Sequence, residues 1–263
     1  MKAIGVFDSG VGGLTVVKEI IKTLPYEDIV YFGDTARVPY GIKSKPTIIK
    51  FSLENILFLL KQDVKIIVVA CNTSSSVALP VLKRHFKIPI IGVISPGVKE
   101  AVYATRGGRI GVIATKATIN SAAYERQIKQ LNPKIKVFNQ ACPLFVPLAE
   151  EGWLKEKATY DIARHYLKPL KDARIDTLIM GCTHYPLLKK VFREILGGSV
   201  TLIDSAMQVT LETKQVLANE GLLNKKRSAK YLFYVSDELQ QFRKLAKNFL
   251  GREITNLRRV NNV

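Results

Sequence analysis

The sequence contains few cysteines, few acidic residues and no long apolar run. Its 263 residues include three cysteines, Cys71, Cys142 and Cys182. Their odd number and wide spacing argue against a disulfide scaffold and a C-x-x-C zinc site, and favour reduced thiols in the cytosol. No apolar stretch reaches the length of a membrane span, and the N-terminus leads into a predicted strand rather than a secretion signal. We therefore expect a cytoplasmic protein with no membrane partner.

Acidic residues number 22 against 40 Lys and Arg, so the net charge is +18. A charge of this size can attract nucleic acid or concentrate small anions, but most of the basic residues are scattered through amphipathic segments. The one dense run is 225–227, and no nucleic-acid recognition motif accompanies it. We expect nucleic acid not to be a partner.

Apolar residues make up 47% of the chain, enough for the core of one large domain or two ordinary ones. Strand-like and helix-like segments alternate nearly throughout, which predicts α/β layers with parallel strands. The predicted strands are Ala3–Phe7, Ile29–Phe32, Lys65–Val69, Ile90–Val93, Arg109–Ile113, Lys136–Asn139, Thr177–Met180, Val200–Ile203 and Tyr231–Val235. The predicted helices are Leu14–Thr23, Thr47–Lys61, Val77–Phe86, Val98–Ala104, Ser121–Gln130, Lys157–Lys168, Leu187–Leu196, Met207–Asn219 and Leu239–Leu250.

A cysteine ends an apolar run twice, in Ile66–Cys71 and again in Thr177–Cys182, about one domain's length apart. A second pair of segments, Ile4–Ser9 and Ile110–Thr115, repeats at a similar offset. The chain is therefore predicted to be duplicated. Because ligands of open α/β sheets bind beyond the carboxyl ends of the strands, the two halves can enclose one small ligand between two thiols.

Each repeated cysteine precedes a predicted helix and is followed by hydroxyl or amide side chains. N-terminal N–H groups and the helix dipole stabilise negative charge, so this environment favours the thiolate. His184 lies two residues beyond Cys182 and can accept or donate a proton there. An isolated cysteine more often packs in a core, and this is the interpretation for Cys142, which precedes the apolar stretch Pro143–Pro147.

The loop Asp8–Thr15 follows the first strand but matches neither the G-x-G-x-x-G nor the G-x-x-x-x-G-K-[ST] nucleotide pattern. Either its glycines bring backbone N–H groups to a small anion while Asp8 acts as an acid or base, or they form a tight turn in which Asp8 caps the helix. A carboxylate from Glu150 or Glu151 can reach the cleft from the second half. A metal site of Asp8, Cys71, Cys182 and His184 is a weak alternative, because no chelating spacing is present.

Four segments occur together in an order and spacing that resemble the bacterial glutamate racemases of the aspartate/glutamate racemase family. The segments are Asp8–Gly13, Asp34–Gly41, Cys71–Thr73 and Gly181–Pro186. The resemblance covers nearly the whole chain and weakens only beyond about residue 207. It implies an α/β fold of two pseudo-twofold-related three-layer domains with mainly parallel sheets and an active site in the cleft between them. The implied domains are residues 1–95 plus 207–263 and residues 96–206.

The resemblance also implies a racemase without cofactor or metal, in which two thiols move the α-proton of glutamate. Cys71 would take it from D-glutamate with help from Asp8, and Cys182 from L-glutamate with help from His184, while Glu150 tunes the second side. Such chemistry needs a base on one face of the stereocentre and an acid on the other. The groups implied to position the substrate are Asp8, Ser9, Tyr40, Gly41, Asn72, Thr73, Thr115, Thr118, Thr183 and His184.

The family further implies a homodimer that supplies D-glutamate for cell-wall peptidoglycan. Three other functions stay open at this point. A two-thiol shuttle does not by itself read the side chain, so aspartate or another amino acid can be the substrate. A hydrolase using Cys182 and His184 leaves Cys71 without a role. A basic protein acting on DNA is the alternative from a different class.

Overall fold

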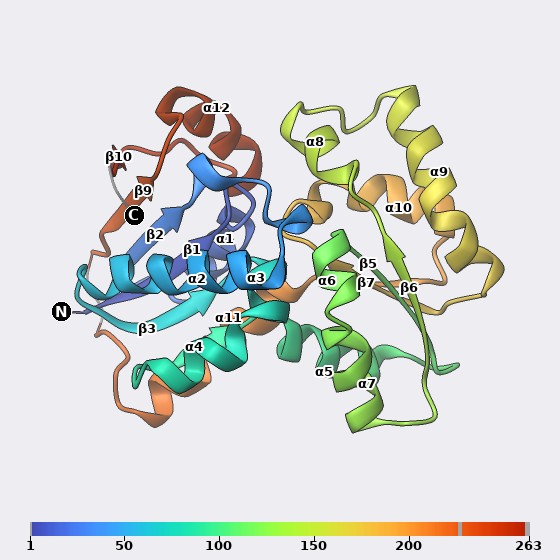
Figure 1. Ribbon diagram of the computed structural model, residues 1–263, viewed down its shortest axis with the longest axis horizontal. Coiled ribbons are helices and arrows are strands. Elements are labelled where there is room, and N and C mark those ends of the chain that lie inside the picture. The colour runs from blue at the N-terminus through green and yellow to red at the C-terminus, as the bar shows by residue number, and fades with distance from the viewer. Residues whose placement is uncertain (1, 226–227, 261–263) are drawn as a thin grey trace.

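The computed structural model describes residues 2–225 and 228–260, so the end of the basic run 225–227 lies outside the described residues. Two parallel sheets lie side by side (Figure 1). The first, in spatial order, consists of β10 (Leu257–Arg259), β9 (Tyr231–Val235), β2 (Ile29–Gly33), β1 (Ala3–Asp8), β3 (Val64–Val69) and β4 (Ile90–Gly92). The second consists of β6 (Lys136–Ala141), β5 (Arg109–Ala114), β7 (Thr177–Gly181) and β8 (Thr201–Ile203).

The predicted duplication is visible in the strand order. Strand β1 lies between β2 and β3, and β5 lies in the same way between β6 and β7, with every pairing parallel. Strands β1, β3 and β7 are buried along their whole length, as expected for short apolar, β-branched runs covered on both faces. The predicted fold class is confirmed.

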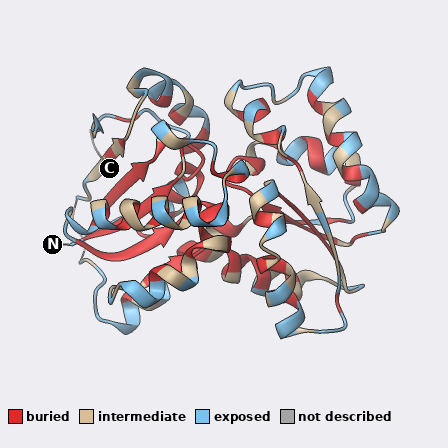
Figure 2. Cartoon of the chain, viewed as in Figure 1, coloured by how far each residue is buried: buried red, intermediate tan, exposed pale blue. Residues whose placement is uncertain are grey.

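Helices cover both faces of each sheet, and the buried residues concentrate in the strands and on the inner helix faces (Figure 2). On the first sheet, one face carries α1 (Leu14–Thr23), α11 (Ser205–Asn219) and α12 (Leu239–Leu250), and the other carries α2 (Lys45–Leu60) and α4 (Leu79–His85). On the second sheet, one face carries α5 (Ile94–Ala104) and α7 (Ala123–Leu131), and the other carries α8 (Phe145–Glu150), α9 (Lys157–Asp172) and α10 (Lys189–Leu196).

Three predicted helices are each preceded in the structure by a further short helix or helical turn. The helix predicted as Val77–Phe86 corresponds to α4, and a further helix, α3 (Asn72–Val77), precedes it, because the Cys71 sulfur accepts the Ser74 N–H and so begins a helix there. The run of small polar residues after Cys71 carries no apolar periodicity, so the sequence pattern missed α3. Likewise α6 (Lys116–Asn120) precedes α7, and a 3-10 turn, η3 (Tyr185–Leu188), precedes α10.

The C-terminal part of the chain returns to the first sheet. Strand β9 pairs with β2, and β10 pairs with β9. A buried ion pair between Lys65 and Glu27, 2.6 Å apart, also holds the segment after α11, because the Lys65 ammonium donates to the Leu222 carbonyl at 2.5 Å. The domain limits at residues 95 and 207 stay a prediction, which this strand membership supports. The predicted limit at residue 95 lies in the first turn of α5.

Among the described residues, no helix combines the length and the apolar character that crossing a membrane requires.

Candidate active site

The two repeated cysteines lie at equivalent strand ends. Cys71 follows β3 and is the N-cap of α3, whereas Cys182 directly follows β7. These strands occupy matching places, next to β1 and next to β5. Both residues are buried, with 5% and 8% of their surface exposed. The topology thus places two thiols from distant parts of the chain at corresponding positions.

A cavity of about 330 Å³ is lined by both thiols and by residues from both halves of the chain. The predicted site residues that line it are Ser9, Tyr40, Gly41, Cys71, Asn72, Thr73, Thr115, Glu150, Cys182, Thr183 and His184. Asp8 and Thr118 are buried directly behind this lining and contact it through hydrogen bonds. The structure therefore brings all the predicted site residues together.

Several lining residues were not predicted as site residues, although Gly10, Val38 and Pro39 lie within the motifs Asp8–Gly13 and Asp34–Gly41. They are Gly10, Val38, Pro39, Ile42, Lys116, Pro143, Val146 and Pro147. Most of them adjoin a predicted site residue, so proximity to a motif was the available signal. The stretch Pro143–Pro147 was interpreted as packing alone, yet part of it faces the cavity.

The Cys71 thiol is held in its protonated form. Burial, together with the nearby Asp8 carboxylate, raises the pKa of Cys71 to about 11. The Ser74 N–H donates to its sulfur at 3.5 Å, and the thiol donates to the Ser9 hydroxyl at 3.7 Å. The expectation that a helix start favours thiolate is wrong for Cys71, because removing a charged sulfur from water costs more than these contacts return.

Asp8 ends β1 and is completely buried. The Gly10 N–H donates to its carboxylate at 3.0 Å, so this loop amide binds the protein's own carboxylate instead of a free anion. On the other side, the Thr183 hydroxyl donates to the same carboxylate at 3.5 Å. Burial raises the pKa of Asp8, although the charge of His184 opposes this shift. The Asp8 carboxylate affects Cys71 through its negative charge, which helps to raise the pKa of that thiol.

His184 connects the second thiol with a carboxylate. Its Nδ1 lies 3.8 Å from the Cys182 sulfur, and its Nε2 lies 2.8 Å from a Glu150 oxygen. Burial by itself lowers the pKa of the imidazole, but its contacts with Cys182 and Glu150 outweigh burial and raise the pKa to about 10. At neutral pH, His184 is therefore an imidazolium beside Cys182.

The raised pKa of His184 makes the stability of the fold depend on pH. An unfolded histidine titrates near 6.5, so the folded chain binds this proton more tightly. The stabilisation is complete below pH 6.5 and is lost as the pH rises to about 10. We expect the free energy of unfolding in urea to fall more steeply over this interval in the wild type than in His184→Gln, which cannot titrate there. Both proteins keep Cys71, so its titration cancels, and equal slopes would contradict the prediction.

Three hydroxyl groups meet at the junction of the two halves. The Thr73 hydroxyl, from α3, lies 3.0 Å from that of Thr115 and 3.2 Å from that of Thr118, which are themselves 3.0 Å apart. Beside them, the Asn72 amide donates to the Tyr124 hydroxyl at 2.8 Å. These neutral donors can bind a carboxylate, and because they come from both halves, a bound carboxylate would bridge the two.

Tyr40 lines the cavity, but its hydroxyl is engaged elsewhere. It donates to the buried Asp34 carboxylate and accepts from the Asn55 amide at 3.1 Å. Arg37 donates to the same Asp34 carboxylate at 2.7 Å and also pairs with Glu54 of α2. Tyr40 therefore offers the cavity its backbone and ring, and this polar network fixes the loop that carries it.

The segment after β9 holds the same loop from outside. The Ser236 hydroxyl donates to Asp34 at 3.0 Å. The Thr35 hydroxyl donates to the Asp237 carbonyl at 2.6 Å and accepts the Asp237 N–H at 2.8 Å. A wall of the cavity is thus positioned by residues some 200 places further along the chain.

Cys142 is placed apart from this chemistry. It is completely buried among apolar side chains, and burial raises its pKa. Its backbone carbonyl accepts the Tyr185 hydroxyl at 2.8 Å, which agrees with the predicted packing role. Within residues 2–225 and 228–260, no group of three His, Cys, Asp or Glu side chains is arranged to hold a metal ion.

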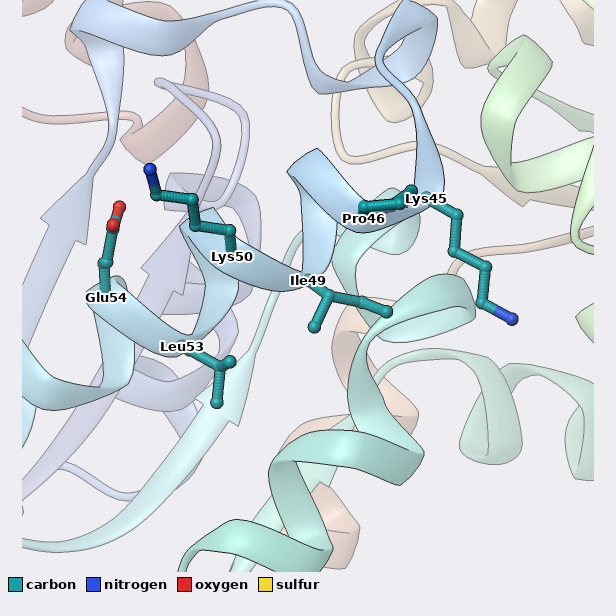
Figure 3. A pocket seen from close by; sticks show the side chains of 6 residues that line it. All are labelled: Lys45, Pro46, Ile49, Lys50, Leu53 and Glu54. Carbon is teal, nitrogen blue, oxygen red and sulfur yellow. The ribbon is translucent and has the colours of Figure 1, made fainter.

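A second hollow, of about 560 Å³, lies on the outer surface of α2 (Figure 3). It is lined by Lys45, Pro46, Ile49, Lys50, Leu53 and Glu54. None of the predicted site residues belongs to it, and Lys45 points away from Lys50 and Glu54, whose charged ends lie on the same side of the helix (Figure 3). The chemistry of this chain therefore concentrates in the cavity between the thiols.

A family model described as Asp/Glu/Hydantoin racemase matches residues 4–211. The chain belongs to this racemase family. This member is 50% identical to a glutamate racemase of Geobacter metallireducens over 260 residues, which cover 98% of this chain and 96% of the relative. It is also 50% identical to a glutamate racemase of Neisseria meningitidis serogroup A, with the same coverage of 98% and 96%. The resemblance drawn from the four motifs is confirmed.

Solved structures of racemases agree with the fold. Glutamate racemase isoform RacE1 of Bacillus anthracis superposes with a TM-score of 0.96 at 40% identity, over 99% of this chain and 97% of that protein. The glutamate racemase of Francisella tularensis, solved in complex with D-glutamate, gives a TM-score of 0.94 at 44% identity, with coverage of 99% and 97%. This racemase therefore shares its whole fold with solved structures named glutamate racemase.

Proposed function

We propose that the protein interconverts L-glutamate and D-glutamate by moving the α-proton between two thiols. The observation that carries the proposal is the pair of cysteines from equivalent strand ends, Cys71 and Cys182, lining one cavity from the two halves of the chain. Inversion of a stereocentre by deprotonation needs an acid and a base on opposite faces of the carbon. The names and near-complete coverage of the relatives support glutamate as the substrate.

In the L-to-D direction, the Cys182 sulfur, as thiolate, takes the α-proton of L-glutamate, and the electron pair stays on the α-carbon and its carboxylate. The Cys71 thiol then gives its proton to the opposite face, which yields D-glutamate. The raised pKa of Cys71, about 11, suits this donor role. The imidazolium of His184, 3.8 Å from the Cys182 sulfur, stabilises negative charge there and is kept protonated by Glu150. In the reverse direction the two thiols exchange roles, with Asp8 assisting Cys71.

The carbanionic charge requires stabilisation, which we assign to the protein itself. Asn72, Thr73 and Thr115 line one region of the cavity, with the Thr118 hydroxyl behind them in contact with Thr73 and Thr115, and Ser9, Thr183 and the loop at Tyr40 and Gly41 border another. Fixed donors in a cleft that excludes water strengthen as charge develops on the substrate carboxylate. They would thereby replace the electron sink that a pyridoxal cofactor provides.

We also propose that the protein works in the cytoplasm as a homodimer and supplies D-glutamate for peptidoglycan. The three free, buried cysteines suit a reducing compartment. Light scattering coupled to gel filtration would measure the mass in solution and so decide between monomer and dimer.

The test is an exchange experiment with pure protein and no added cofactor. L-Glutamate is incubated with the enzyme in deuterated water, while optical rotation and α-deuteration are followed. We expect the rotation to decay to zero and the product to acquire one α-deuterium. Constant rotation without exchange would overturn the proposal, and faster racemisation of aspartate would replace the substrate.

A further inference from the structure

The His184 ring is held in part by the C-terminal helix. Phe249 of α12 packs against it, with ring centroids 5.2 Å apart and an angle of 78° between the planes. His184 follows β7 of the second sheet, whereas α12 covers the first sheet. The contact therefore crosses the junction between the halves, and it joins residues 65 places apart in the sequence.

The other sides of the ring have partners of a different kind. Its two nitrogens face Cys182 and Glu150. The glycine loop approaches so closely that a Cβ on Gly12 would lie 2.6 Å from the His184 Nδ1. The polar contacts set the position of the nitrogens, while Phe249 and the glycine loop limit how far the ring can tilt.

Phe249 is itself firmly placed. It is 1% exposed and belongs to the apolar cluster that includes Phe242, Ala246 and Leu250 of the same helix. The family match ends at residue 211, so α12 lies outside the part of the chain that the racemase family model describes. A side chain from this outer segment nevertheless reaches the proposed proton machinery.

We propose that Phe249 is a positioning residue, which keeps the His184 imidazole aligned between Cys182 and Glu150. An edge-to-face ring contact is directional and is worth about 0.5–1.5 kcal/mol beyond the area it buries. Loss of the contact lets the ring tilt, and a small misplacement of an acid–base group costs up to about 100-fold in rate. This inference rests on the proposed function, and it makes the C-terminal helix part of the active site.

The test compares Phe249→Leu with Phe242→Leu. Both residues are buried on α12, but Phe242 packs on Tyr31 rather than on His184. We expect Phe249→Leu to lower kcat/KM for glutamate by about 10- to 100-fold. We expect Phe242→Leu to lower the unfolding temperature about as much as Phe249→Leu does, but to change kcat/KM by less than about threefold.

A primary isotope effect separates positioning from a structural loss. Because proton transfer at Cys182 becomes slower, the effect on kcat/KM should rise for α-deuterated L-glutamate and fall for α-deuterated D-glutamate in Phe249→Leu. Phe242→Leu should keep both wild-type values. Unchanged isotope effects in Phe249→Leu would overturn the proposal. If this variant does not fold, Phe249→Met, which retains most of the volume, carries the same test.

A second measurement does not depend on racemisation. The chain has three histidines, so ¹⁵N-histidine labelling gives few signals, and His184→Gln assigns the one of interest. The His184 ring signals should shift in Phe249→Leu and stay in place in Phe242→Leu. If the wild type racemised nothing, the proposed function would fail while these signals still decided whether Phe249 holds the ring.

Discussion

Replacement of either Cys71 or Cys182 by Ala is expected to abolish measurable racemisation of glutamate, a loss of about 10⁴-fold. Each thiol serves one face of the stereocentre, so the remaining thiol cannot complete the inversion. Alanine removes only the sulfur at each strand end, although at Cys71 this also removes the acceptor of the Ser74 N–H. The measurement is the rate of change of optical rotation, starting from each enantiomer.

The matched control is Cys142→Ala. Cys142 is also buried, at 0% exposure, but it lies in the apolar cluster of the second half instead of the cavity. The Cys142→Ala substitution should lower the free energy of unfolding by about 1 kcal/mol, because it leaves a small void, and should leave the rate of racemisation unchanged. A Cys71→Ala or Cys182→Ala variant that racemises glutamate as fast as Cys142→Ala would contradict the two-thiol mechanism.

Gly12→Ala is expected to lower kcat by about 100-fold while the fold persists. A Cβ at this position would lie 2.2 Å from the Thr183 hydroxyl and 2.6 Å from the His184 Nδ1. Both distances are shorter than real contacts, so these two side chains must move out of place. The relevant measurements are kcat with L-glutamate and the thermal unfolding midpoint.

Gly198→Ala serves as the comparison. A Cβ there meets no atom within 4 Å, so neither activity nor stability should change appreciably. Full activity in Gly12→Ala would show that the close approach of the glycine loop to His184 is not needed for the reaction.

Much of the fold could be predicted from local patterns. Strands such as β1, β3 and β7 are short continuous apolar runs, which is the pattern of buried parallel strands. Helix α3, before the predicted helix Val77–Phe86, was missed because it begins with a sulfur cap and a run of small polar residues, and neither produces an apolar stripe. Strand β10, only Leu257–Arg259, is too short to leave a periodic signal.

The site was predicted as a set of residues, but the chemical state of these residues was not. The helix start suggested a thiolate at Cys71, whereas burial keeps it a thiol with a pKa of about 11. Tyr40 was expected to help position the substrate, yet its hydroxyl is committed to Asp34 and Asn55. Burial and hydrogen-bond partners depend on residues that are distant in sequence, so no local pattern reports them.

By itself, the sequence determined the alternation of strands and helices, the repeated cysteine and the motifs of the family, because apolar periodicity and motif spacing are properties of neighbouring residues. Only the tertiary structure decided that the thiols share one cavity, that His184 is charged between Cys182 and Glu150, and that Phe249 packs on its ring. These features arise where parallel strands from two halves end at one junction, and there the positions and desolvation of the groups are set by the packing of the whole chain.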